Sequence, residues 1–101
     1  MAGIIIYVSA TVLPGNKKIF ETTLTDIVSK ARQAPGCLKY QWFVNPDNNS
    51  NYIIYGEFDS KENFALYQKS EVVSMIGKQL IPLLKDKPSF KHFLAENFEQ
   101  G

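Results

Sequence analysis

Residues 4–15 read Ile-Ile-Ile-Tyr-Val-Ser-Ala-Thr-Val-Leu-Pro-Gly, a run of β-branched and aromatic residues closed by a turn-forming pair. Such a run is typical of a strand, and we predict one over residues 4–13. It is too apolar for a strand with one face in water, so both faces need cover. The Pro14-Gly15 pair ends the strand, and Asn16 is a candidate N-cap for the helix that follows.

The next segment is predicted to be an amphipathic helix over residues 17–32. Apolar side chains recur there with the i, i+3, i+4, i+7 spacing that places them on one face of a helix. They are Ile19, Phe20, Thr23, Leu24, Ile27, Val28 and Ala31. Ala-Pro-Gly at residues 34–36 ends the helix, because proline and glycine both interrupt helical hydrogen bonding.

Residues 37–44 are predicted to form a second strand, because two sets of side chains alternate along them. The alternation places Leu38, Tyr40, Trp42 and Val44 on one face and Cys37, Lys39, Gln41 and Phe43 on the other. Asn-Pro-Asp-Asn-Asn-Ser at residues 45–50 contains only turn-forming residues, so we expect a hairpin loop there. The loop leads into a third strand over residues 51–58, antiparallel to the second.

A second helical region follows the third strand. Asp59 and Ser60, with an acidic and an amide side chain shortly downstream, indicate a helix start. The apolar stripe of this helix begins with Phe64 and Tyr67. The helical pattern resumes over residues 72–84 after a break near residue 70, and a proline at residue 82 marks its last turn. We expect one kinked helix or two abutting ones.

The last strand is predicted over residues 89–98. Its alternation sets Phe90, His92 and Leu94 against Lys91, Phe93 and Ala95. The full order, β-α-β-β-α-β, is that of a ferredoxin-like α+β fold with a four-stranded antiparallel sheet and both helices on one face. At 101 residues, 45% of them apolar, the chain suits one domain over residues 1–101.

Charge and cysteine content exclude several classes of protein. The formal net charge is +1 and the Lys and Arg residues are scattered, so the chain lacks a basic footprint for nucleic acid. The apolar stretch at residues 3–8 is too short for the core of a signal peptide, so we expect a cytoplasmic protein without a membrane segment. Cys37 is the single cysteine, which excludes an internal disulfide and a cysteine-based zinc site.

The face of the sheet without helices is predicted to be apolar. Residues expected on it are Ile5, Tyr7, Leu13, Phe43 and Phe93. A contiguous exposed apolar patch of this kind marks an interaction surface, and the simplest partner is an identical sheet related by a two-fold axis. We therefore predict a homodimer formed through the helix-free sheet face.

RNA-recognition domains share this element order and stack bases on aromatic residues of the helix-free face. Ile-Tyr-Val at residues 6–8 resembles one of their two motifs. The other motif begins with Lys or Arg followed by Gly, whereas the third strand here starts at Asn51 and ends beside Glu57. These differences argue against nucleic acid as a partner.

Three short motifs are distributed along the chain. They are Leu-Pro-Gly at residues 13–15, Ala-Pro-Gly-Cys-Leu-Lys-Tyr at 34–40 and Tyr-Gly-Glu-Phe-Asp-Ser-Lys-Glu at 55–62. In this order and spacing the chain resembles, over nearly its whole length, the antibiotic biosynthesis monooxygenase type of dimeric α+β barrel. The resemblance implies a face-to-face dimer, with an apolar pocket between sheet and helices in each subunit.

The same resemblance implies oxygenation of a planar, hydrophobic, quinol-like substrate without metal, flavin or other cofactor. An electron-rich phenolate or enolate can itself reduce oxygen, so the protein need only deprotonate, orient and desolvate it. Two alternatives stay open. One is a non-catalytic protein that binds such a molecule, and the other is an isomerase or decarboxylase that uses the same pocket.

His92 and Tyr67 are the candidate catalytic residues. His92 is the only side chain whose unperturbed pKa suits proton transfer near neutrality. Tyr67 lies on the expected pocket side of its helix, where its hydroxyl can bind a substrate oxygen. The alternative interpretations are a structural or solvated histidine, and a core tyrosine with a polar tip.

Aromatic residues are the candidate substrate-binding side chains, namely Tyr40, Trp42, Phe58 and Phe64. Phe58 stands where the family commonly has Trp, so it lacks an indole N–H donor. Haem-degrading relatives use an Asn, a Trp and a ligating His, and our alignment places Val8, Tyr67 and Gly77 at those positions. No axial ligand is present there, so haem degradation is not expected. Large aromatics in a strand that faces helices are also ordinary core residues.

Overall fold

The computed structural model describes residues 2–96. The main elements are β1 (Ala2–Thr11), α1 (Lys17–Ala31), β2 (Cys37–Asn45), β3 (Asn48–Phe58), α2 (Lys61–Gln68), α3 (Glu71–Met75) and β4 (Ser89–Glu96). A π-helical turn (Ile76–Leu80) and a 3-10 turn (Ile81–Leu83) continue α3. The predicted α+β class and element order are confirmed. The last two residues of the predicted final strand, 97 and 98, lie outside the described residues.

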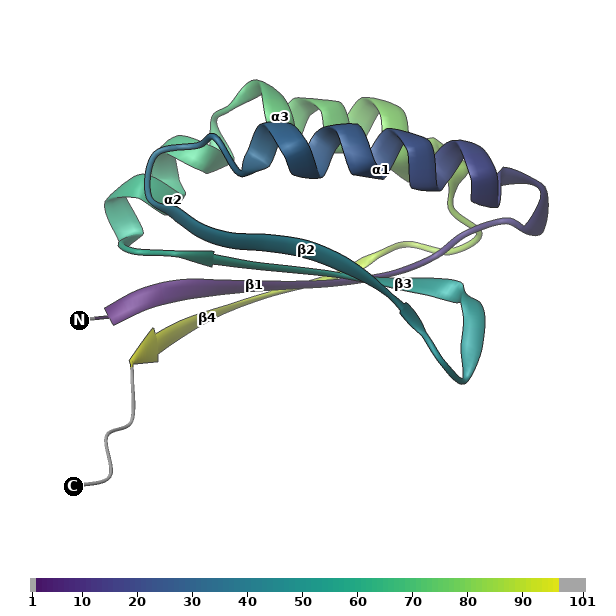
Figure 1. The fold of residues 1–101 in the computed structure, drawn as a ribbon, viewed down its shortest axis with the longest axis horizontal. Coiled ribbons are helices and arrows are strands. Elements are labelled where there is room, and N and C mark those ends of the chain that lie inside the picture. The colour runs from purple at the N-terminus through teal and green to yellow at the C-terminus, as the bar shows by residue number, and fades with distance from the viewer. Residues whose placement is uncertain (1, 97–101) are drawn as a thin grey trace.

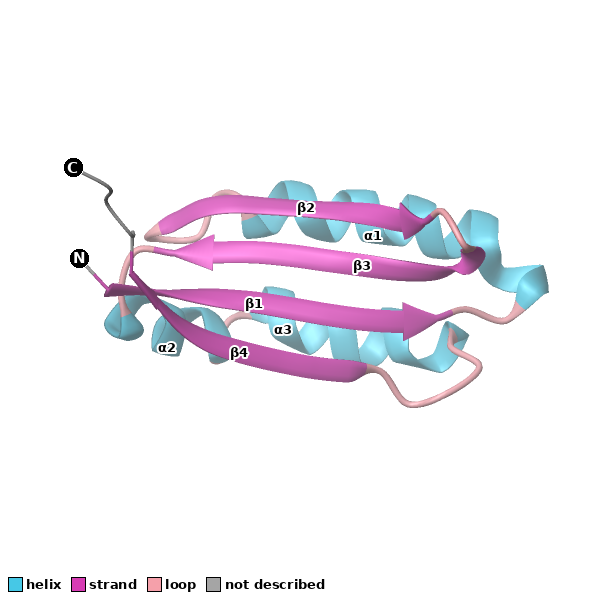
Figure 2. Ribbon diagram, turned by 90° about the horizontal axis from the view of Figure 1, so that it is seen from below, coloured by secondary structure: helices cyan, strands magenta, loops and turns pink. Residues whose placement is uncertain are grey.

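The four strands form one antiparallel sheet in the order β2-β3-β1-β4. All helices lie on one face of this sheet (Figure 1). Viewed through the sheet, α1 lies behind β2 and β3, whereas α2 and α3 lie behind β1 and β4 (Figure 2). This is the split βαβ arrangement of the ferredoxin-like fold, as predicted.

The core lies between the sheet and the helix layer. Alternate residues of β1 point into it, and Val12 just beyond the strand is fully buried. α1 contributes one buried stripe, made of Phe20, Leu24, Ile27, Val28 and Ala31. Tyr52 of β3 connects the two layers, because its buried ring packs on Phe20 and its hydroxyl donates a 2.5 Å hydrogen bond to Glu21.

The hairpin between β2 and β3 is tighter than predicted. Only Pro46 and Asp47 form the turn, and the loop expected over residues 45–50 is largely strand. The Asn45 side chain accepts a hydrogen bond from the Asp47 N–H, and the Asn48 side chain accepts one from Ser50. These asparagines satisfy nearby backbone donors themselves, so turn-forming residues are accommodated within the strand ends.

Three residues predicted to be on particular faces are placed differently. Leu38 is exposed because the register shifts between Cys37 and Lys39, so it does not share the inner face with Tyr40. Ile19, expected on the buried stripe of the helix, is also exposed. Leu13 lies beyond the end of β1 and therefore is not part of the open sheet face.

The loops that flank the helices depend on specific local contacts. Ser60 caps α2 by accepting a hydrogen bond from the Asn63 N–H, as its sequence pattern predicted. Asn16 occupies the N-cap position of α1 without a capping hydrogen bond, and its amide donates to Leu83 O instead. Gly36 has φ of 75°, a conformation that favours glycine. Its backbone packs closely against Asp59 and Asn63.

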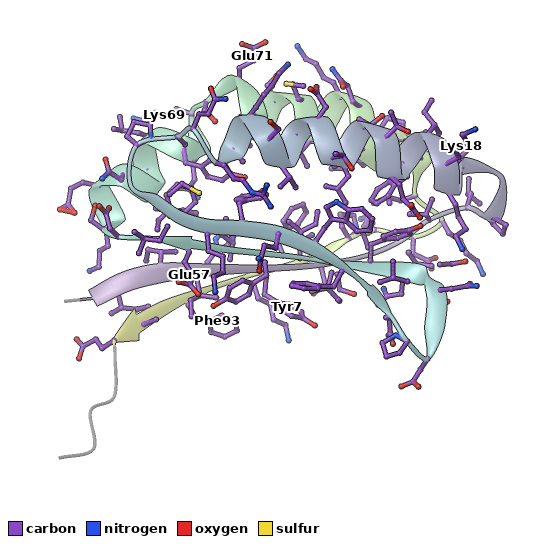
Figure 3. All side chains as sticks on the ribbon, viewed as in Figure 1. Tyr7, Lys18, Glu57, Lys69, Glu71 and Phe93 are labelled. Atoms are coloured by element: carbon purple, nitrogen blue, oxygen red, sulfur yellow. The ribbon has the colours of Figure 1, made fainter. Side chains whose placement is uncertain are left out.

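The helix-free face of the sheet carries the predicted apolar residues except Leu13. Tyr7 is 38% exposed, and Phe43 and Phe93 are each 50% exposed. Tyr7 and Phe93 project away from the helix layer in Figure 3. Their neighbours in register include Ile5, Ile53 and Tyr55, so the apolar residues extend across all four strands. Such a patch marks an interaction surface.

Candidate functional site

A cavity of about 310 Å³ lies between the inner face of the sheet and the α2–α3 segment. Its floor is built from buried side chains of β1, β2, β3 and α2. These are Ile6, Val8, Tyr40, Ile54, Phe64 and Tyr67. Because the floor is almost entirely apolar and aromatic, it suits a flat hydrophobic molecule.

The rim of the cavity is exposed and comes from different elements. Gln68 and Gly77 border it on the helix side, Ile81 follows the π-helical turn, and Phe90 and His92 border it on β4. β4 is an edge strand of the sheet. The cavity therefore opens to solvent along this edge, where Phe90 and His92 are exposed.

Helical spacing and a helix break produce this geometry. Phe64 and Tyr67 are three residues apart on α2, so both rings face the sheet. The helix then stops at Lys69 and restarts after Ser70, and α3 runs into the π-helical turn. π-helical turns widen a helix locally and are frequent at functional sites. Here the turn forms part of the cavity wall, with Gly77 at the rim.

Two buried tyrosines meet at the cavity floor. The hydroxyl oxygens of Tyr40 and Tyr67 lie 2.6 Å apart and share a hydrogen bond. Burial raises the pKa of both tyrosines, most strongly that of Tyr67, whose pKa is raised further by the neighbouring Tyr40. Both phenols are therefore neutral near pH 7, and they can donate or accept hydrogen bonds without carrying charge.

His92 lies at the opposite side of the cavity from the helix backbone, on β4. Its imidazole contacts the ring of Phe64 edge-on, with centroids 5.0 Å apart. Through Phe64 it is linked to the aromatic group on α2, since Phe64 and Tyr67 are stacked with centroids 6.1 Å apart. The imidazole is exposed to solvent and also borders the apolar floor. It can therefore reach both water and a molecule bound in the cavity.

The cavity brings together four of the six predicted site residues, Tyr40, Phe64, Tyr67 and His92. Phe58 is buried behind the floor, where its ring packs 4.8 Å from that of Tyr67. Trp42 lies away from the cavity, near Tyr52, and borders a separate groove beside α1. Phe58 thus supports the site from behind, and Trp42 does not reach it.

Several lining residues were not identified from the sequence. Gln68 follows Phe64 by four residues, so helical spacing could have placed it at the rim. Phe90 lies on the same face of β4 as His92, so the alternation of side chains along the strand could have placed it beside the cavity. Ile81 had no such signal, because its direction depends on the π-helical turn that precedes it.

Val8, Tyr67 and Gly77, the positions aligned with the functional residues of haem-degrading relatives, all line the cavity. None of these side chains supplies a nitrogen ligand to iron. Within residues 2–96, no three His, Cys, Asp or Glu side chains gather closely enough to hold a metal ion.

In the described part of the chain, no helix has the length and apolar character needed to cross a bilayer.

Solved structures share this fold at low sequence identity. A proposed antibiotic biosynthesis monooxygenase from Caulobacter crescentus CB15 has a TM-score of 0.87 and 20% identity, covering 95% of this chain and 92% of its own. Rv0793 from Mycobacterium tuberculosis has a TM-score of 0.85 and 14% identity, covering 98% and 99%. A conserved protein from Methanosarcina mazei Go1 has a TM-score of 0.86 and 15% identity, covering 92% of each chain.

Sequence comparison identifies the family. No curated protein matches the chain with significance. The family model described as antibiotic biosynthesis monooxygenase matches residues 3–95, nearly the whole chain. The chain therefore belongs to the antibiotic biosynthesis monooxygenase family.

Proposed function

We propose that this protein is a monooxygenase that acts without a cofactor on a planar, hydrophobic aromatic molecule of the quinol or anthrone type. The observation that carries the proposal is the apolar cavity whose buried floor offers only the hydroxyls of Tyr40 and Tyr67 as side-chain polar groups. A floor of this kind excludes water around a flat substrate and holds one of its oxygens. Family membership supports the same reaction class.

The proposed chemistry uses the electrons of the substrate. For an anthrone, His92 removes a proton from the ring CH₂ and leaves an enolate, which transfers electrons to O₂. A hydroperoxide forms at that carbon and loses water to leave a ketone, so that CH₂ and O₂ become C=O and H₂O. The protein supplies proton transfer, orientation and exclusion of bulk water.

We propose different roles for the two candidate catalytic residues. Burial strongly raises the pKa of Tyr67, so its hydroxyl stays protonated, is not available as a base, and acts instead as a hydrogen-bond donor to the substrate oxygen. The exposed His92 can exchange its proton with solvent and is therefore the base. Phe64 lies between them and supplies an aromatic surface for the substrate.

Oxygen consumption with a panel of quinols and anthrones tests the proposal. We expect one O₂ consumed per substrate, incorporation of one labelled oxygen atom from ¹⁸O₂ into the ketone, and no loss of turnover after treatment with chelator. Absence of oxygen uptake across the panel, with binding retained, would instead support a non-catalytic binding protein. A product that differs from the substrate without added oxygen would indicate isomerisation or decarboxylation.

We also propose that the helix-free sheet face pairs with the same face of a second copy. The exposed Tyr7, Phe43 and Phe93 support this proposal, because aromatic side chains are enriched at the centre of interfaces. On the same face Glu57 lies opposite Lys39 in register, so charges of both signs are available to a two-fold partner. The cavity is on the other side of the sheet and would stay open in such a dimer.

A further inference from the structure

The hydrogen bond between Tyr40 and Tyr67 leaves one hydroxyl hydrogen without a partner. Each tyrosine carries one O–H donor and acceptor lone pairs. The pair makes one shared hydrogen bond, and neither hydroxyl makes another within residues 2–96. One donor is thus used, and the second O–H has no acceptor in the part of the protein that the structure describes.

This free donor is buried. Tyr40 is 2% exposed and Tyr67 is 5% exposed, and both line the cavity. Buried donors without an acceptor are rarer in proteins than acceptors with an unused lone pair, because loss of the donor's hydrogen bond is the greater penalty. The free O–H therefore is available to an acceptor oxygen in the cavity, either of water or of a ligand that displaces it.

The neighbouring side chains do not supply that acceptor. The other floor residues are apolar, and the remaining polar side chains that line the cavity, Gln68 and His92, are exposed at its rim. The raised pKa of each tyrosine is consistent with both hydroxyls keeping their protons. An acceptor must then come from a molecule inside the cavity.

We propose that the Tyr40–Tyr67 pair makes the cavity selective for ligands that present an acceptor oxygen, a ketone or enolate oxygen, at the buried end. This inference deepens the proposed function and rests on it for the location of the substrate. In that reaction the ketone oxygen of the substrate becomes an enolate oxygen. A donor that is already polarised by a second tyrosine stabilises the developing negative charge, as an oxyanion hole does.

Calorimetry and infrared spectroscopy with 1-indanone test the proposal, with indane as the probe that lacks the oxygen. We expect 1-indanone to bind about three- to tenfold more tightly than indane, the range for one hydrogen bond. The carbonyl stretching band of bound 1-indanone should lie at lower wavenumber than in an apolar solvent. No turnover is needed, so oxygenase activity does not affect the readout.

Three variants and one control sharpen the test. Tyr40→Phe and Tyr67→Phe each leave one free O–H, so each should keep a shifted band, whereas Tyr40→Phe/Tyr67→Phe should lose the shift and the preference over indane. Tyr52→Phe removes another buried tyrosine hydroxyl, one bonded to Glu21 away from the cavity, and should leave the band unchanged. The wild-type band alone is decisive if the double variant does not fold.

An unshifted band for 1-indanone bound to the wild-type protein would overturn the inference and leave the proposed oxygenase intact. A shifted band that persists in a folded double variant would also overturn it. If neither probe binds, the inference fails, whereas the proposed oxygenase is still decided by oxygen uptake with quinols and anthrones. A shifted band together with absence of oxygen uptake for all quinols and anthrones would support the inference and reject the oxygenase.

Discussion

The imidazole of His92 and the ring of Phe64 meet edge-on, at an interplanar angle of 74° and a centroid distance of 5.0 Å. One residue belongs to the edge strand β4 and the other to α2, so this contact joins the two sides of the cavity. The contact keeps the imidazole of His92 beside the ring of Phe64, where a flat substrate would lie.

His92→Gln should lower kcat for the oxygenase reaction by about 10²- to 10⁴-fold, the usual contribution of a general base. Substrate affinity should change by less than about threefold, because the apolar floor is untouched. Lys91→Gln is the matched control, since Lys91 is the neighbouring residue and points to the open face. Oxygen-electrode kinetics and calorimetry measure the two effects, and equal turnover in both variants would remove His92 from the mechanism.

Gly77→Leu should obstruct the cavity while the protein stays folded. A Cβ added at Gly77 meets no atom within 4 Å, so the larger side chain has room at the rim. We expect ligand affinity to fall by at least about tenfold, equivalent to about 1.4 kcal/mol. Gly15→Leu is the control, because Gly15 also has open space and does not line the cavity. A Gly77→Leu variant that binds like the control would show that the rim at residue 77 is not used by the ligand.

Gly36→Ala should destabilise the protein without a direct effect on the site. The positive φ of Gly36 and the close approach of Asp59 and Asn63 leave no room for a Cβ. We expect a loss of about 2 kcal/mol, or roughly 10 °C in Tm for a domain of this size. Thermal unfolding monitored by circular dichroism measures it, and Gly15→Ala should stay within about 0.5 kcal/mol of wild type. Equal Tm values for the two variants would contradict the packing at Gly36.

Tyr52→Phe should reduce stability by about 1.5 kcal/mol near pH 7, because a hydrogen bond to the Glu21 carboxylate is lost. Burial, together with this carboxylate, raises the pKa of Tyr52 from 10.0 to about 12. Above pH 10 the unfolded chain releases the Tyr52 proton while the folded protein still holds it. The stability that Tyr52 contributes should therefore be lost as the pH rises from about 10 to about 12. Denaturant unfolding of the wild-type protein and of Tyr52→Phe from pH 7 to pH 12 measures the difference between their free energies of unfolding. A difference that stays the same between pH 10 and pH 12 would show that the Tyr52 hydroxyl is not bonded to Glu21.

Phe93→Glu should convert the proposed dimer into a monomer, since it places a charge among the exposed aromatic residues of the open face. Sedimentation velocity at micromolar concentration measures the change. Ile19→Glu is the control, because Ile19 is a similarly exposed apolar residue on α1 in the helix layer. A wild-type protein that sediments as a monomer would reject the dimer directly.

Periodicity in the sequence was sufficient to predict the fold. The β-branched run of the first strand and the i, i+3, i+4, i+7 stripe of the helix that follows are local patterns, and each predicts its element without knowledge of tertiary contacts. Two of the errors fall where backbone irregularities occur, at the bulge that exposes Leu38 and at the two-residue turn of the β2–β3 hairpin. A bulge shifts the register by one residue, and no alternation pattern shows where it occurs.

The site was less predictable, because a cavity depends on where side chains are missing. Trp42 and Tyr40 lie on the same strand face, and only the positions of the helices determine that Tyr40 lines the cavity while Trp42 packs beside α1. The tyrosine pair joins residues 27 positions apart in the sequence. Its hydrogen bond could not be read from either local pattern.

The π-helical turn over Ile76–Leu80 contains one residue more than an α-helical turn would need. Loss of a single residue there would convert the turn to regular α-helix and remove its local widening, while the side chains before and after it would keep nearly the same relative orientation. The cavity wall beside Ile76 and Gly77 would change shape, whereas the contacts of Leu83 and Leu84 with Val12 and Leu13 would stay. A change of length in this segment would therefore alter the width of the cavity without displacing the elements on either side of it.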